Sequence, residues 1–440
     1  MREVIITMDI KEYRDRIDEL DLQSSLFKGS AEKKKCGLLG RKLSHSYSPL
    51  IHSIYADYSY ALFEVEPEDL GDFIKNGDWN AINVTVPYKR DVMAYLDDIS
   101  DTAKKIGAVN TVVRRPDGTL FGDNTDIFGF LYMCDRAGIS LEGKKCLVLG
   151  SGGSSHTVCT ALAARGAREV LVVSRSGEVN YDNVYEHRDA DIIINTTPVG
   201  MYPNVGVSPI ELSRFPSLSG VIDIVYNPRV TELLYQARTL GIPSVGGLSM
   251  LCAQALQASE LFCGEERDRS LIEAAEERVR QECENVILVG MPGCGKSRVS
   301  EALGRLLSRQ VIDTDTLVVE KRGMSIPEIF AREGEEAFRW YEHEAVCVAG
   351  AKSSMIIATG GGVPTRKNNI KPLSQNGRIV YLRRPTHELA RDGRPLSENA
   401  DMDALFATRR PFYEGCADIV IDVRESPEAT AMAVIEALRK

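Results

Sequence analysis

The sequence predicts an α/β fold with about three domains, and three observations support this prediction. The chain has 440 residues, which suits three domains of roughly 150 residues each. Short apolar runs typical of buried strands alternate with stretches of helical spacing. Two of these runs, residues 145–149 and 286–289, lead into glycine-rich loops that open a helix. Such loops turn free backbone N–H groups toward an anion, so we expect two phosphate-binding sites of different design.

Composition excludes several classes of protein. The formal net charge is −10 and the basic residues are scattered, which argues against a nucleic-acid partner. The 10 cysteines include no C-x-x-C pair, so we expect reduced thiols rather than disulfides or a zinc site. No stretch approaches a membrane span and residues 1–20 contain no apolar signal segment, which predicts a cytoplasmic protein with no membrane partner.

The spacing of the strand-like runs divides the chain. Residues 146–149, 169–173, 191–195 and 220–224 follow one another as in a nucleotide-binding α/β domain. Residues 248–263 have apolar residues at helical spacing and are expected to pack back on the first domain. The predicted order is an N-terminal extension of helical character (1–35), a first α/β domain (36–125 with 241–264), a Rossmann-like domain (126–240), a charged linker ending in a helix (265–284) and a further α/β domain (285–440).

The first glycine loop has no lysine, which suits a dinucleotide better than a transferable phosphate. Its residues are Gly150, Ser151, Gly152, Gly153, Ser154 and Ser155. The next strand ends in Ser174, Arg175 and Ser176, where an acidic residue would favour NAD. A serine and an arginine there favour the 2′-phosphate of NADP, although Arg175 could also be an exposed residue of a surface turn.

Hydride transfer to a carbonyl needs a group that protonates the developing alkoxide. Lys89 stands just past a predicted strand, and Asp126 lies in a turn next to the predicted domain junction. A lysine and an aspartate that meet at a cleft can hold a proton for transfer. Each residue alone could equally be a solvated surface charge.

The second glycine loop, Gly290-x-x-x-x-Gly295-Lys296-Ser297, is a full P-loop signature of an ATP or GTP site. We expect Lys296 to reach the β- and γ-phosphates and Ser297 to ligate Mg²⁺. The next strand ends in Asp313 and Asp315; one carboxylate can help hold Mg²⁺ and the other can face an acceptor hydroxyl. Two acids at a strand end could instead cap a helix.

Seven motifs in residues 36–264 make this part of the chain resemble the shikimate dehydrogenase family. They are His45-Ser46-Tyr47-Ser48-Pro49, residues 83–89, Gly107-Ala108-Val109-Asn110-Thr111, Gly122-Asp123-Asn124-Thr125-Asp126, residues 195–201, Tyr226-Asn227-Pro228 and the segment from Gly246 to Gln254. The resemblance implies Lys89 as acid and base, with Asp126 beside it. The implied substrate contacts are Ser46, Ser48, Thr85, Asn110, Asp126, Tyr226 and Gln254, and Gly247 is an implied NADP contact.

Two departures from that family concern the cofactor. The family usually has Asn-Arg-Thr where this chain has Ser174-Arg175-Ser176, and its frequent second arginine is missing. Only about fifteen residues separate Ser174 from the strand at Asp191, so we expect a nucleotide domain shortened by one αβ unit.

Residues 285–440 resemble shikimate kinase, which implies a P-loop kinase domain with a parallel sheet and a lid. The motifs are the P-loop, the segment from Phe330 to Glu342, Ala358-Thr359-Gly360-Gly361-Gly362, residues 391–396 and Arg409-Arg410-Pro411-Phe412-Tyr413. The implied shikimate contacts are Asp315, Arg339, Gly361, Gly362 and Arg409; the implied ATP contacts are Gly293, Cys294, Gly295, Lys296, Ser297, Arg298 and Arg394; and the implied metal ligands are Ser297 and Asp313. Arg391 and Arg394 stand closer together than in typical relatives, which leaves the adenine contact of Arg391 open.

Together the two resemblances imply one bifunctional enzyme that acts on small molecules. NADPH would reduce 3-dehydroshikimate to shikimate, and ATP with Mg²⁺ would phosphorylate the new hydroxyl. Two alternatives stay open: a first half that oxidises quinate with NAD, and a shikimate-sensing regulator without turnover. All four residues whose loss would mark a regulator are present, namely Lys89, Asp126, Lys296 and Asp315. Fusion could serve transfer of shikimate between the sites or only joint expression.

Overall fold

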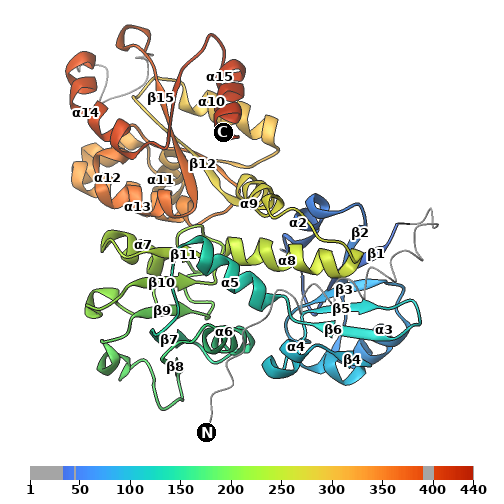
Figure 1. Cartoon of the computed structure of the whole chain (residues 1–440). Helices are drawn as coiled ribbons and strands as arrows, with labels where there is room; N and C mark the ends of the chain where they lie inside the picture. The colour runs from blue at the N-terminus through green and yellow to red at the C-terminus, as the bar shows by residue number, and fades with distance from the viewer. Residues whose placement is uncertain (1–32, 44–45, 390–400, 440) are drawn as a thin grey trace. The chain divides into compact units, whose positions relative to one another are not determined.

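The computed structural model describes residues 33–43, 46–389 and 401–439. The predicted N-terminal extension therefore lies almost entirely outside the described residues. Contacts divide the chain into two compact units, one mainly from residues before Arg280 and the other mainly from Arg280–Lys440. The first unit contains two sheets and the second contains one. The predicted α/β class is confirmed (Figure 1).

The first sheet has six strands in the order β2-β1-β3-β5-β6-β4. β1 is parallel to β2 and β3, whereas β5 is antiparallel to both β3 and β6. Apolar side chains from the central strands and from α3 form its core, including Leu39, Ile74, Ile82 and Val112. The strands are β1 (Lys35–Gly40), β2 (Ser59–Glu64), β3 (Ala81–Val84), β4 (Asp98–Ile99), β5 (Thr111–Arg114) and β6 (Leu120–Asp123), and the helices are α2 (Ser48–Tyr55), η2 (Pro67–Asp69), α3 (Leu70–Asn76), η3 (Asp91–Tyr95) and α4 (Asp101–Ile106).

The second sheet has five parallel strands in the order β11-β10-β9-β7-β8. Its interior strand β7 is fully buried, as expected for a parallel sheet covered on both faces. The elements are α5 (Asp126–Arg136), β7 (Lys145–Leu149), α6 (Gly153–Ala164), β8 (Glu169–Val173), η4 (Val184–His187), β9 (Ile192–Asn195), η5 (Leu212–Arg214), β10 (Gly220–Asp223), α7 (Glu232–Thr239) and β11 (Ser244–Gly246).

Two features of this sheet bear on the predicted domain limits. Only the short helix η4 connects β8 to β9, and β8 is the sheet edge, as expected for a domain shortened by one αβ unit. Residues 241–264 were assigned to the first domain, but β11 pairs with β10 in the second sheet. That part of the assignment is wrong, because three residues, Ser244–Gly246, are too few to show a strand period.

Helix α8 (Leu248–Cys263) packs on the first sheet as predicted. Its Ala258, Leu261 and Phe262 share a core cluster with Cys36 of β1 and Ala81 of β3. The charged linker ends in α9 (Ser270–Cys283), a helix with a continuous buried stripe. The stripe is Ile272, Ala275, Val279 and Cys283. α9 is thus a packed element rather than only a connection.

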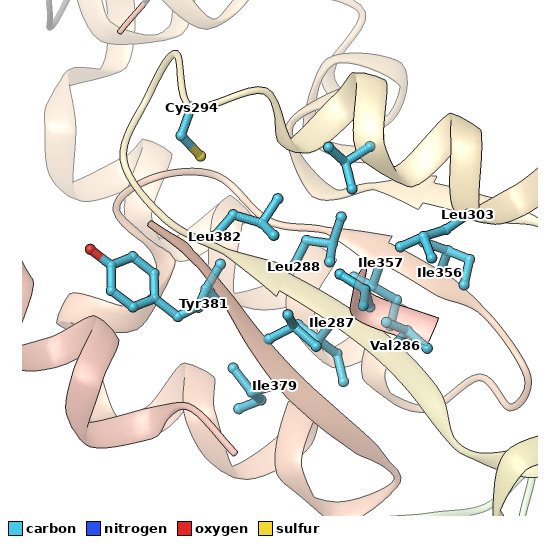
Figure 2. Close-up of a cluster of buried hydrophobic side chains, with 14 of the residues drawn as sticks. Val286, Ile287, Leu288, Cys294, Leu303, Ile356, Ile357, Ile379, Tyr381 and Leu382 are labelled. Atoms are coloured by element: carbon cyan, nitrogen blue, oxygen red, sulfur yellow. The ribbon is translucent and has the colours of Figure 1, made fainter. Parts of the chain in front are cut away.

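The third sheet has five parallel strands in the order β13-β14-β12-β15-β16. Its core is rich in branched side chains, with Ile287 of β12 between Ile357 and Ile379 of the neighbouring strands (Figure 2). The elements are β12 (Asn285–Val289), α10 (Lys296–Leu307), β13 (Val311–Asp313), α11 (Thr314–Arg322), α12 (Ile326–Gly350), β14 (Ile356–Ala358), η6 (Val363–Thr365), α13 (Lys367–Gln375), β15 (Gly377–Arg383), η7 (Thr386–Glu388), α14 (Met402–Cys416), β16 (Ile419–Asp422) and α15 (Pro427–Leu438).

The order of this sheet places the functional loops at one edge. The P-loop follows β12, Asp313 ends β13 and the glycines from Gly360 follow β14. Parallel neighbouring strands bring their carboxyl ends together, so these three segments meet. Among the described helices, none is long and apolar enough to span a bilayer.

Candidate active sites

An ion pair between Lys89 and Asp126 forms the centre of the first candidate site. Lys89 Nζ lies 2.5 Å from Asp126 Oδ2. Lys89 lies in the turn after β3, and Asp126 is the first residue of α5. The side chains are 25% and 15% exposed, so a substrate can reach the pair although water is largely excluded. A lysine held beside a carboxylate in this way can deliver and recover a proton.

Two predicted amide residues lie next to this ion pair. Asn110 Nδ2 donates to Asp126 Oδ1 at 2.9 Å, and Asn110 Oδ1 accepts from the Thr125 N–H at 2.8 Å. Gln254 of α8 accepts from the Thr125 hydroxyl at 3.4 Å. The structure therefore gathers Lys89, Asp126, Asn110 and Gln254 from four separate segments into one polar cluster.

The predicted carboxylate clamp lies at the start of α2. The Ser48 N–H donates to Ser46 Oγ at 3.2 Å, and Tyr47 stands between the two serines in the chain. The ring of Tyr47 meets that of Tyr226 edge to face, with centroids 6.2 Å apart. Thr85, directly after β3, is half-buried. Tyr226 is thus a neighbour of the clamp motif.

The first glycine loop is open at the N-terminus of α6. Gly150 has a φ of +105°, and a Cβ there would lie 2.9 Å from Thr196 Oγ1, so only glycine fits. Gly152 caps α6 without a side-chain hydrogen bond, and a Cβ on Gly152 or Gly153 would meet nothing within 4 Å. Ser151 and Ser154 are exposed and Ser155 is buried. The uncovered backbone fits a pyrophosphate at a helix N-terminus.

The turn after β8 presents Ser174, Arg175 and Ser176 with no acidic residue among them. Arg175 is exposed, so a 2′-phosphate could reach its side chain. Gly247 packs so closely that a Cβ there would lie 1.9 Å from the Ile224 carbonyl oxygen. Packing therefore requires glycine at this position, in addition to the predicted contact with the cofactor.

The P-loop folds around its own lysine. Lys296 Nζ donates to the carbonyl oxygens of Gly290 and Met291 at 2.9 and 3.0 Å, and the side chain is buried. Cys294 is also fully buried beneath the loop, which fits a spacer residue. Phosphate oxygens are stronger acceptors than backbone carbonyls, so the ammonium is placed to exchange these bonds for nucleotide contacts.

The two carboxylate oxygens of Asp313 make different contacts. Its Oδ1 caps α11 by accepting from the N–H groups of Asp315 and Thr316, at 2.9 and 3.3 Å. Its Oδ2 accepts from Ser297 Oγ at 3.2 Å. The cap therefore orients the carboxylate toward the P-loop hydroxyl, and the two predicted metal ligands are adjacent.

Asp315 lies in a cluster of carboxylates. Burial raises the pKa of Asp315 to about 6, and the neighbouring carboxylates Asp313 and Glu342 act in the same direction. Lys296 and Arg339 partly offset this shift in the pKa. A carboxylate with a pKa near neutrality can accept a proton from an attacking hydroxyl.

Arg339 of α12 is held by two acids. Its Nη1 lies 3.0 Å from Glu342 Oε1 and its Nη2 3.1 Å from Glu335 Oε1. A Cβ on Gly362 would lie 2.3 Å from Arg339 Nη1, so the glycine strand end passes directly over the guanidinium. Arg409 Nη1 donates to the Gly361 carbonyl at 3.4 Å, which brings the second predicted carboxylate partner to the same glycines.

These residues line one cavity of about 710 Å³ in the second unit. Its lining includes the five P-loop positions from Gly293 to Ser297, Arg298, both aspartates, Arg339, Gly361, Gly362 and Arg409. Three predicted residues lie outside the described part of the chain: His45 of the clamp motif, and Arg391 and Arg394 of the lid.

Two functional contacts were not predicted. Glu342, 1% exposed, holds Arg339 and faces Asp315; the spacing of Arg339 and Glu342, three apart on a helix, signals such a pair. The Tyr413 hydroxyl donates to the Gly361 carbonyl at 2.6 Å, a contact between distant segments that no local spacing reveals.

Comparisons with known proteins find family matches for both parts of the chain. Residues 38–112 match the family model "Shikimate dehydrogenase substrate binding domain", and residues 292–439 match "Shikimate kinase". A shikimate dehydrogenase (NADP(+)) of Clostridium beijerinckii is 41% identical over 246 residues, which are 51% of this chain and 90% of the relative.

Solved structures show the same likeness for the first unit. A chorismate mutase/shikimate 5-dehydrogenase fusion protein from Clostridium acetobutylicum is 35% identical with a TM-score of 0.54, covering 57% of this chain and 98% of that one. Shikimate 5-dehydrogenase from Thermus thermophilus in complex with NADP(H) and shikimate is 33% identical with a TM-score of 0.51, covering 55% and 98%. The chain therefore belongs to the shikimate dehydrogenase family and carries a shikimate kinase domain after it, which makes it a bifunctional oxidoreductase and kinase of the shikimate pathway.

Proposed function

We propose that the first site reduces 3-dehydroshikimate to shikimate. Bound NADPH would supply the hydride to the C3 carbonyl carbon. Lys89 donates a proton to the carbonyl oxygen as negative charge develops there, and Asp126 orients the ammonium group. Ser46 and Ser48 bind the substrate carboxylate, and Asn110 and Gln254 bind ring hydroxyls. The Lys89–Asp126 pair is the observation that supports this half most strongly.

The cofactor of this half is NADP in our proposal. The open backbone at Gly152 and Gly153 fits the pyrophosphate, and exposed Arg175 after β8 fits the 2′-phosphate. The relative from Clostridium beijerinckii is named for NADP(+), and the Thermus thermophilus structure is a complex with NADP(H).

The second site phosphorylates the hydroxyl that the first site makes. Asp315 accepts the proton of the C3 hydroxyl while its oxygen attacks the γ-phosphorus of ATP and ADP leaves. Lys296 stabilises charge on the transferred phosphoryl group, and Arg339 and Arg409 bind the shikimate carboxylate. The shared cavity of about 710 Å³, lined by P-loop and arginines together, supports this assignment.

Magnesium fits the second site. Among the described residues no group of three or more His, Cys, Asp or Glu side chains could hold a metal ion. Mg²⁺ in phosphate sites needs only one or two protein oxygens, and Ser297 Oγ and Asp313 Oδ2 are 3.2 Å apart. When bound there with ATP, Mg²⁺ would neutralise charge on the β- and γ-phosphates.

A stepwise assay with the purified chain tests the proposal. With 3-dehydroshikimate and NADPH alone, we expect NADPH oxidation and shikimate; after ATP and Mg²⁺ are added, shikimate 3-phosphate accumulates. Faster turnover of quinate with NAD than of shikimate with NADP would contradict the reaction proposed for the first site. Absence of turnover despite tight shikimate binding would support a regulator instead.

A further inference from the structure

A line of buried polar side chains crosses the first sheet next to the Lys89–Asp126 pair. In the strand register, Asn83 of β3 stands opposite Thr111 of β5, and Thr111 stands opposite Asp123 of β6. Asn83, Thr111 and Asp123 are 5%, 1% and 7% exposed, in strands whose other residues are mainly apolar. Buried polar groups are costly unless they are hydrogen-bonded, so their bonding partners indicate what they do.

Asn83 and Thr111 of this line belong to a directed chain of hydrogen bonds, whereas Asp123 accepts from Ser100 and Asn124. The Tyr60 hydroxyl donates to Asn83 Oδ1 at 2.7 Å, and Asn83 Nδ2 donates to Thr111 Oγ1 at 3.3 Å. Thr111 Oγ1 then donates to Asn110 Oδ1 at 3.0 Å. Asn110 Nδ2 donates to Asp126 Oδ1 at 2.9 Å. Every donor points toward the carboxylate, an order in which successive bonds polarise one another favourably.

The direction of the chain decides how the Asn110 amide is oriented. An asparagine amide can present either its oxygen or its NH₂ group to a neighbour. Thr111 Oγ1 and the Thr125 N–H both donate to the Asn110 oxygen, which leaves the NH₂ group facing Asp126. A turned amide would place its oxygen against the carboxylate. The fixed amide holds Oδ1 of Asp126, so that Oδ2 remains directed at Lys89.

The far end of the chain is also fixed. The Tyr60 ring stacks on His52, with centroids 4.1 Å apart and planes 14° from parallel. Burial raises the pKa of Tyr60 well above its usual value, so its hydroxyl stays protonated and able to donate. The clamp residue Ser48 acts in the opposite direction on that pKa, which places it near the Tyr60 hydroxyl. The chain therefore begins beside the proposed carboxylate clamp and ends at the proposed proton donor.

We propose that Thr111 is a positioning residue for carbonyl reduction, which acts by fixing Asn110 and through it Asp126 and Lys89. This inference rests on the proposed reduction of 3-dehydroshikimate. Thr111 touches none of the reacting groups; its hydroxyl accepts from Asn83 and donates to Asn110. Substituting valine removes that hydroxyl at nearly constant volume, whereas substituting serine keeps it.

Single-turnover reduction tests this role, with excess enzyme over NADPH and saturating 3-dehydroshikimate. The rate constant measures hydride transfer in the competent enzyme, and the amplitude falls below the NADPH added only when competent enzyme is scarcer than NADPH. For Thr111→Val we expect a rate constant lower by about tenfold at unchanged amplitude. For Thr111→Ser we expect a rate constant within about twofold of the wild type, because the donor is retained.

Combining Thr111→Val with Asp126→Asn tests the route of the effect. If Thr111 acts through Asp126, valine slows the Asp126→Asn enzyme by less than about twofold. An unchanged rate constant in Thr111→Val, equal slowing by valine and serine, or a loss confined to the amplitude would each overturn the inference. A wild-type enzyme that does not oxidise NADPH with 3-dehydroshikimate would instead refute the proposed function.

Discussion

The two glycine loops share one framework and differ in what occupies it. Both follow a buried interior strand, β7 or β12, and both open a helix, α6 or α10. The first leaves its backbone uncovered, whereas the second encloses Lys296. In the proposed reactions the dinucleotide reacts far from its phosphates, but ATP reacts at a phosphate. A loop of backbone N–H groups therefore suffices to hold phosphate groups that do not react. A loop with a lysine is needed where a phosphoryl group is transferred.

The ionisable groups of the two sites differ in the same sense. The first site has one partly exposed ion pair, Lys89 with Asp126. The second gathers Asp313, Asp315 and Glu342 around one cavity, and burial together with like charge raises the pKa of Asp315. One site therefore presents a ready proton donor, and the other presents a base tuned by its neighbours.

Removing Lys89 should break the first site and leave the second intact. We expect Lys89→Ala to lower kcat for reduction by about 10³-fold, because general acid catalysis is lost. Phosphorylation of added shikimate serves as the control on the same chain and should keep its wild-type rate. Loss of both activities would mean that the halves are coupled or that the variant is misfolded.

Removing Lys296 should break the second site and leave the first intact. Lys296→Ala should lower kcat for phosphorylation by about 10²- to 10³-fold, since charge on the transferred phosphoryl group loses its fixed partner. NADPH-dependent reduction should not change. A kinase activity within about twofold of the wild type would show that the buried lysine is structural only.

The pH profile separates the two sites by their ionisation. In the proposed phosphorylation Asp315 acts as the base when ionised, and its pKa is raised to about 6, so the active fraction falls as the pH drops below that value. At pH 5 about one tenth of Asp315 would be ionised, so kcat/KM for phosphorylation should fall by about tenfold from pH 7. An acid limb with a midpoint near pH 4 would contradict the assignment, since an ordinary aspartate titrates there.

The preference for NADPH over NADH is the property for which we expect the smallest effect. Arg175→Ala should raise KM for NADPH by about tenfold, because a charge-assisted hydrogen bond to the 2′-phosphate is lost. KM for NADH should change by less than about twofold. Arg165, an exposed arginine of the same domain that pairs with Asp135, provides the matched control. Equal changes for NADPH and NADH would place the 2′-phosphate elsewhere.

Much of the fold could be predicted because it depends on local signals. Apolar runs and glycine loops marked β7, β12 and their helices, and a count of residues predicted the short connection between β8 and β9. β11 has only three residues, so no period reveals it. The stripe of α9 is buried, but the surrounding Glu and Arg residues made it resemble a linker.

The sequence names the residues of the candidate sites, but it does not reveal the hydrogen bonds among them. The sequence cannot tell which oxygen of Asp313 caps α11 and which meets Ser297. The pairing of Asn83 with Thr111 depends on the register of antiparallel strands, which is set by tertiary packing. Such contacts join segments far apart in the chain, so local patterns do not reveal them.

The most direct measurement follows one atom through both reactions. The purified chain is given 3-dehydroshikimate, ATP, Mg²⁺ and NADPH that carries deuterium at the transferred position. The account predicts shikimate 3-phosphate with deuterium on C3, the carbon whose oxygen bears the phosphate. A phosphorylated product without deuterium at that carbon, or deuterated shikimate that is never phosphorylated, would contradict it.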